Sequence, residues 1–175
     1  MQLVKPATFL VLVLLLPIGC ARHNALPGPD QFSCGVPHCA LARVPGVRLV
    51  RDDDGRALLH EATGARVAIE YLDGRPGAVD ALLARWRERL APVVDWRQPP
   101  DAASGFRVRG LTGQRRPPAG VFVDPDPVRV WLATWENPAT GSVLVLRTAA
   151  PASVWDRAWA DLEPVLTRVA FTPRF

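Results

Sequence analysis

The chain has 175 residues, of which 49% are hydrophobic and 22% are charged, and it carries a net charge of +4 at pH 7. This composition excludes a wholly disordered chain, and the length is that of one domain. Lys5 is the only lysine, so the positive charge is nearly all arginine. That is typical of a GC-rich genome and also suits phosphate or carboxylate recognition, but no basic block indicates a nucleic-acid partner.

Residues 1–19 have the pattern of an export leader. One positive charge, Lys5, precedes an apolar run over residues 9–16, and a small residue comes directly before Cys20. A cysteine at that point resembles the lipobox of bacterial lipoproteins, although Pro17 stands where such boxes usually have leucine. The resemblance implies that residues 1–19 are removed and that Cys20 is lipidated and holds the protein at a membrane.

Two alternatives to a lipid anchor exist for this leader. One is an ordinary secretory signal that contains a cysteine. The other is a membrane-spanning helix, although the apolar run is much shorter than the roughly 20 residues that a bilayer requires. If the lipobox is used, residue 21 follows the lipidated cysteine. It is alanine, and not the aspartate that retains some lipoproteins at the inner membrane. We therefore expect the outer membrane, facing the periplasm, in a cell with two membranes.

Residues 20–45 are rich in proline, glycine and polar residues and have no hydrophobic period. They are predicted to form a tether between the anchor and a single α+β domain over residues 46–175. The tether contains Cys34 and Cys39, and two cysteines this close are predicted to form a local disulfide in an oxidising envelope compartment. A thiol or metal site that uses these two cysteines and His38 is the alternative.

The domain begins with three short strands separated by tight turns, which predicts an antiparallel meander. A helix follows from about Pro76 to Leu90, with apolar residues at helical spacing on one side. Four more strands and a closing amphipathic helix over about residues 153–168 complete the chain, and Pro164 is expected to kink or split that helix. The predicted strands are residues 47–51, 56–61, 66–72, 106–111, 120–123, 128–135 and 142–147.

The arrangement of these elements follows from their residue patterns. Residues 142–147 are apolar on both faces, which places this strand in the centre of the sheet. Ser153 and Asp156 are predicted to cap the last helix. Tight turns favour antiparallel pairing, with helices packed on the sheet. We therefore predict an α+β fold, an antiparallel β-sheet of about six to seven strands packed by two main helices.

The second half of the chain resembles the PsbP-like family. The resemblance is carried by the strand that begins at residues 105–108, the apolar hairpin from Trp131 to Leu146, and the closing helix that ends in residues 169–171. It covers about residues 46–172 and is a pattern of elements, so no functional residue is transferred. The resemblance implies a small α/β sandwich that binds or stabilises other proteins rather than catalysing a reaction.

No catalytic residue is predicted, because the sequence contains no nucleophile elbow, zinc-protease helix or phosphate-binding loop. His60, beside Glu61 in a predicted strand, is interpreted as a histidine at the rim of the sheet. Trp131 and Trp135 share one face of a strand with Arg129. The two tryptophans belong to the core if a helix covers that face. If none does, the three side chains form an aromatic–arginine binding patch.

Arg115 and Arg116 are expected in an exposed loop, where they are solvated or meet lipid headgroups or an acidic partner. Together these observations predict a non-enzymatic, membrane-anchored envelope lipoprotein that binds an envelope protein or has a structural role, without cofactor or metal. The first alternative is a carrier or sensor of a small apolar ligand held between the sheet and its helices, which a tryptophan-lined pocket would favour. The second is an enzyme or redox protein that uses the cysteine site.

Overall fold

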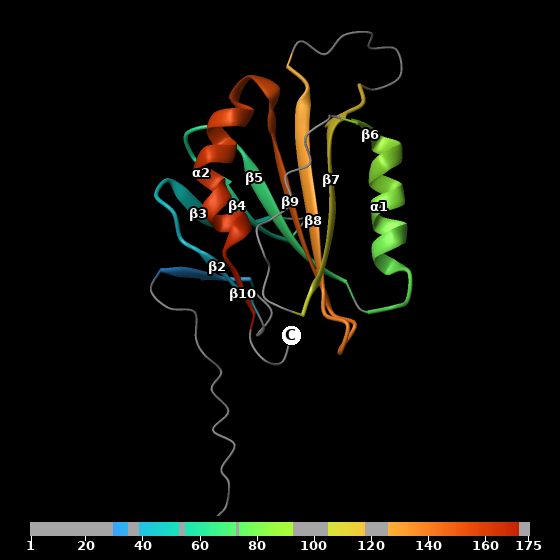
Figure 1. The fold of residues 1–175 in the computed structure, drawn as a ribbon. Coiled ribbons are helices and arrows are strands. Elements are labelled where there is room, and N and C mark those ends of the chain that lie inside the picture. Colours follow the sequence, from blue (N-terminus) through green and yellow to red (C-terminus); the bar gives the residue numbers. More distant parts are fainter. Residues whose placement is uncertain are drawn as a thin grey trace, which may run out of the picture.

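The computed structural model describes residues 30–34, 39–52, 55–72, 74–92, 105–117 and 126–171 (Figure 1). The strands are β1 (Gln31–Ser33), β2 (Cys39–Ala42), β3 (Val47–Asp52), β4 (Gly55–His60), β5 (Arg66–Leu72), β6 (Leu90–Pro92), β7 (Arg107–Arg115), β8 (Val128–Glu136), β9 (Val143–Pro151) and β10 (Val169–Phe171). The helices are α1 (Ala78–Arg89), a 3₁₀ turn over Ala152–Val154, and α2 (Trp155–Thr167). None of the helices in these ranges is long and apolar enough to cross a membrane.

The larger sheet has the strand order β3-β4-β5-β9-β8-β7-β6, and every neighbouring pair is antiparallel. The predicted α+β fold is confirmed, and β9 occupies the central position that its two apolar faces indicated. β6 has only three residues, too few for an alternating pattern to show, and the sequence prediction does not contain it. The strand predicted over residues 120–123 lies outside the described residues.

Helix α2 covers one face of this sheet and closes the main core (Figure 1). Alternate residues of β8, Trp131, Ala133 and Trp135, are buried in this core together with the apolar stripe of α2. The ring of Trp131 meets that of Trp159 edge to face, with 5.3 Å between centroids. Pro164 lies inside α2, and the helix continues through it without being split.

The start of α2 is held by a contact that differs from the predicted capping pair. The Ser153 hydroxyl donates a hydrogen bond to Asp126 at 2.6 Å, and the Ser153 backbone N–H donates another at 2.9 Å. These two hydrogen bonds lower the pKa of the Asp126 carboxyl below its ordinary value, and the bond from the Ser153 hydroxyl has the larger effect. Asp126 precedes β8 and is far from Ser153 in sequence, so local spacing could not indicate this contact.

Helix α1 packs on the opposite face of the sheet. It begins after Gly77, which adopts a φ of 82° that favours glycine. Leu82 and Leu83 form a second apolar cluster with Leu132 of β8 and residues of β9. Leu132 directly follows Trp131 in the strand, so the two side chains point to opposite faces. The sheet therefore separates the two clusters (Figure 1).

The segment expected as a tether contributes to the folded domain, which corrects the predicted boundary at residue 46. β1, β2 and β10 form a second, three-stranded antiparallel sheet, in which β2 pairs with the last strand of the chain. Phe32 and Leu41 are buried in the main core. These strands are too short to show a period, and the partner of β2 is at the other end of the chain. The described domain therefore starts at about residue 30.

His60 is buried, not at the rim as expected, and is only 3% exposed. Its Nδ1 lies 2.7 Å from Thr63 Oγ1, and its Nε2 lies 3.3 Å from Asp161 Oδ2 on α2. The imidazole therefore has polar partners on both nitrogens and connects the end of β4 to the helix.

Candidate binding surface

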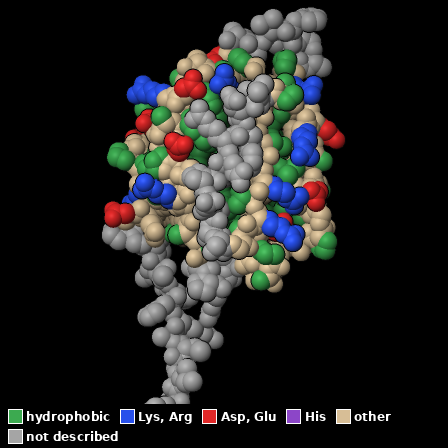
Figure 2. Space-filling view, viewed as in Figure 1, with side chains coloured by type: hydrophobic (Ala, Val, Ile, Leu, Met, Phe, Trp, Pro, Cys, Tyr) green, Lys and Arg blue, Asp and Glu red, His purple; other side chains and the backbone are tan. Residues whose placement is uncertain are grey.

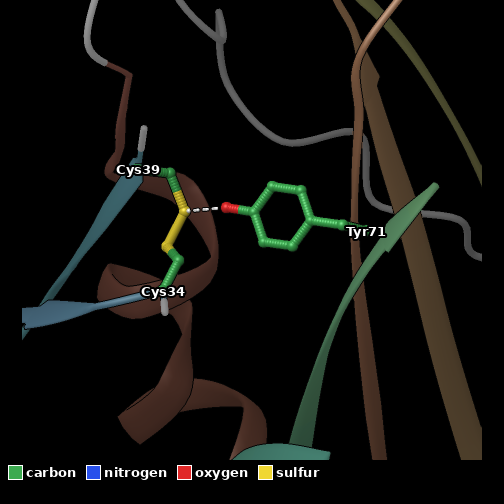
Figure 3. Close-up of a disulfide and its surroundings, with 3 residues drawn as sticks. All are labelled: Cys34, Cys39 and Tyr71. Carbon is green, nitrogen blue, oxygen red and sulfur yellow. Dashed lines mark hydrogen bonds between the residues drawn. A yellow bond between two sulfur atoms is a disulfide. The ribbon is translucent and has the colours of Figure 1, made fainter. Parts of the chain in front are cut away.

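The structure contains the predicted disulfide between Cys34 and Cys39, which joins the end of β1 to β2 (Figure 3). The hydroxyl of Tyr71 on β5 donates a hydrogen bond to Cys39 Sγ at 3.0 Å. Burial raises the pKa of this Tyr71 hydroxyl above its ordinary value, so it stays protonated. A disulfide leaves neither sulfur as a thiolate for metal binding. Cys20 and His38 lie outside the described residues, and in the described ranges no three His, Cys, Asp or Glu side chains gather as metal ligands.

The binding patch considered for Arg129, Trp131 and Trp135 is wrong as a surface, because α2 covers it. Trp131 and Trp135 are each 1% exposed, and Arg129 is half-buried. The two tryptophans belong to the core, as the other interpretation of the sequence held. Together with Trp159 they fill the region between α2 and the sheet in which a carrier of an apolar ligand would need a pocket.

A hollow of about 210 Å³ lies on the other face of the sheet, outside the cluster that α1 covers. Its floor consists of Ala57, Ala68 and Ala149 on the adjacent strands β4, β5 and β9, and Ala57 is directly opposite Ala68. Because alanine side chains are short, the sheet surface is low there. Four arginines complete the lining, and we call the site the arginine hollow. They are Arg56, Arg66, Arg115 and Arg147. Arg56 lies opposite Ile69, which is buried in the α2 core, so the alternation of strand residues directs its side chain to the other face and leaves three arginines to charge the hollow.

In the part of the chain that the structure describes, no carboxylate lines the arginine hollow. Arg147 is positioned from two sides, by Glu70 with 3.3 Å between Nη2 and Oε1, and by the face of Trp86 with its Cζ 5.2 Å from the ring centroid. Within the described ranges, Arg115 has no carboxylate at ion-pair distance. Arg66, Arg115 and Arg147 bring three positive charges to one small space, and these charges attract an anion to it.

Trp86 of α1 connects the arginine hollow to a neighbouring depression of about 340 Å³. Arg147 and Arg89 both lie over its ring, at 5.2 and 5.8 Å from the centroid. Arg115 lines both hollows, and Arg116 lines the second. Figure 2 shows basic side chains, with acidic ones among them, along the side of the molecule on which α1 lies. The accessible aromatic–arginine surface is therefore centred on α1 rather than on β8.

A larger cavity of about 580 Å³ lies at the start of α1, but its charges are mixed. Arg109 pairs there with Asp80 and Glu136. Gly74 and Gly141 approach so closely that a Cβ on Gly74 would overlap the backbone of Gly141. Because Arg109 already has two carboxylate partners, this cavity attracts an anion less strongly than the arginine hollow does.

Sequence reasoning missed the arginine hollow, although one signal was present. Arg66 and Ala68 on β5, and Arg147 and Ala149 on β9, alternate with buried residues and must share a face. Only the register between β5 and β9, which places Ala68 opposite Arg147 and Arg66 opposite Ala149, brings the two pairs together. That register links residues far apart in the chain.

No family model matches the chain, and no curated protein matches it in sequence. Among solved structures, its fold is similar to that of LpqN from Mycobacterium tuberculosis, which is involved in cell envelope biogenesis. The TM-score is 0.56 and the identity 13%, and the match covers 82% of this chain and 90% of LpqN. The likeness shows a shared fold. The resemblance to the PsbP-like family stays a prediction.

Proposed function

We propose that this protein is a lipid-anchored protein of the bacterial cell envelope and that it acts by binding rather than by catalysis. The observation that carries the proposal is Cys20, placed directly after an export leader. A fold similar to that of LpqN, a protein involved in envelope biogenesis, supports it. In a cell with two membranes, the proposed location is the outer membrane, facing the periplasm.

The binding role is supported by the difference between the faces of the sheet. One face is closed by α2 over a core of tryptophans, and the other has the arginine hollow and Trp86 beside it. A partner in the envelope, with anionic groups on its surface, fits this second face. A carrier of a small apolar ligand gains no support, because the region between α2 and the sheet is filled by Trp131, Trp135 and Trp159.

The anchor is tested by the intact mass of the protein extracted from membranes. We expect the mass of residues 20–175 with a diacylglyceryl group and an acyl chain on Cys20. A Cys20→Ser variant should lose the lipid mass and its retention in the membrane. The matched control is Cys34→Ser/Cys39→Ser, which changes cysteines in the folded domain and should keep both. A mature chain without lipid would contradict the proposal and leave a secreted protein without an anchor.

A further inference from the structure

We propose that the arginine hollow binds the phosphate groups of anionic lipid headgroups and so docks the domain on the membrane that holds its anchor. The inference rests on the proposed function for the presence of that membrane. Beyond the anchor, it names a ligand, a binding site and the orientation of the domain on the membrane. Arg66, Arg115 and Arg147 supply the charge, and three alanines supply the space.

The charge and geometry of the arginine hollow favour phosphate. A guanidinium donates hydrogen bonds as a planar fork that matches phosphate and carboxylate oxygens. Arg66, Arg115 and Arg147 belong to three different strands around a floor of alanines. Arg147 is already positioned by Glu70 and Trp86, and its Nε is buried without an acceptor in the described structure.

The size of the arginine hollow also limits the ligand. Its volume of about 210 Å³ is below the roughly 300–1,000 Å³ that is typical of pockets for drug-sized ligands. This space admits a phosphate with a small substituent and is too small for an acyl chain. A headgroup therefore enters while its chains stay in the bilayer.

The revised domain boundary keeps the folded domain near the membrane. The described fold starts at Asp30, whose carbonyl accepts a hydrogen bond from the Arg43 backbone N–H at 2.8 Å. Only residues 21–29 then separate the fold from the lipidated cysteine, so Asp30 lies at most about 35 Å from Cys20 when they are fully extended. A tether running to residue 45 would have allowed a much larger separation. A domain tethered this closely to the bilayer meets headgroup phosphates at high local concentration.

The orientation of the domain follows from the position of the arginine hollow. The hollow is on the face that carries α1, and α2 covers the opposite face. Docking through the hollow therefore directs α2, and the small sheet that packs on the same side, away from the membrane. Arg116 and Arg89, in the neighbouring depression, would lie on the same side as the headgroups.

The test uses residues 21–175, which include every described helix and strand but not the lipidated cysteine. Binding is measured to vesicles of phosphatidylcholine with and without phosphatidylglycerol, and to soluble glycerol 3-phosphate. Arg66→Gln/Arg115→Gln removes two arginines that line the hollow on the α1 face. The matched control, Arg157→Gln/Arg168→Gln, removes two exposed arginines on or next to α2 and so has the same net charge.

We expect the parent chain and the control to bind vesicles that contain phosphatidylglycerol and not those of phosphatidylcholine alone. The hollow variant should bind about thirtyfold more weakly, because each arginine near an anionic surface contributes appreciably to the attraction. The control should change little, since its arginines are on the far face and are screened by salt. Equal binding by the two variants would overturn the proposal, as would a parent chain that binds no vesicle.

Two further outcomes would replace the lipid with another ligand and overturn the docking claim. Binding of glycerol 3-phosphate without binding of vesicles, lost in the hollow variant, would indicate a soluble phosphate ester. Binding of polyglutamate with no response to either phosphate probe would indicate an acidic protein. The chain used here has no lipid anchor, so its result is separate from the mass measurement: an acylated protein can fail this test, and an unacylated one can pass it.

Discussion

The two faces of the seven-stranded sheet are built from the same strands and differ in what they contain. On the α2 face, β8 contributes Trp131 and Trp135, each 1% exposed. On the α1 face, β5 and β9 contribute arginines and alanines outside the cluster that α1 covers. Because strand residues alternate between faces, neighbours in sequence serve different purposes. The comparison indicates that the α2 face supplies stability and the α1 face supplies a binding surface. Substitutions on each face can test this.

The largest effect is expected from Trp131→Ala on the α2 face. Truncating a fully buried tryptophan removes apolar burial and leaves a cavity, which costs about 3–5 kcal/mol of the free energy of unfolding. Denaturant unfolding at constant pH measures the loss. Trp131→Ala that remains folded should bind phosphatidylglycerol vesicles as tightly as the parent chain does. A loss below about 1 kcal/mol would show that this face is not the main source of stability.

The disulfide is expected to have the next largest effect, because it fixes the small sheet that packs on the α2 side. Cys34→Ser/Cys39→Ser opens a short loop, for which chain entropy gives a loss of about 2 kcal/mol. Thermal unfolding with and without a reductant measures it. The reductant should lower the midpoint of the parent chain and leave that of the variant unchanged. A parent chain insensitive to a reductant that breaks the bond would contradict this account.

One substitution made on both faces compares them directly. Ala133 is fully buried under α2, so Ala133→Leu overpacks the core and should cost about 1–3 kcal/mol. Ala68 is half-buried in the floor of the arginine hollow, so Ala68→Leu should change stability by no more than about 0.5 kcal/mol. Ala68→Leu should weaken vesicle binding, since the new side chain fills the hollow. The reverse pattern, in stability or in binding, would break the distinction between the faces.

The smallest effect concerns Asp126, whose carboxylate accepts hydrogen bonds from Ser153 at the start of α2. Its pKa is lowered in the folded state, so the carboxylate stabilises the fold above the unfolded pKa of about 3.9. This contribution is lost as the pH falls through the folded pKa. The stability difference between the parent chain and Asp126→Asn should therefore shrink as the pH is lowered below about 4. A difference that is constant with pH would contradict this role.

The sequence predicted those elements whose pattern is local. The meander of β3, β4 and β5, both helices and the central position of β9 follow from periodicity and turns. The small sheet could not be predicted, because β1, β2 and β10 are too short to show a period and pair across the whole chain. The burial of Trp131 depended on whether a helix covers its face. The arginine hollow depended on the register of Ala68 opposite Arg147, which no local pattern encodes.

The account is tested most directly by mapping, with nuclear magnetic resonance, where soluble dihexanoyl-phosphatidylglycerol changes the spectrum of residues 21–175. We predict that the shifts gather at the backbone amides of Ala57, Ala68 and Ala149 and at the indole of Trp86, while the indoles of Trp131 and Trp159 are unchanged. Shifts at those two buried indoles, with none at the alanines, would contradict the account. They would place the ligand between α2 and the sheet and return the protein to the class of apolar-ligand carriers.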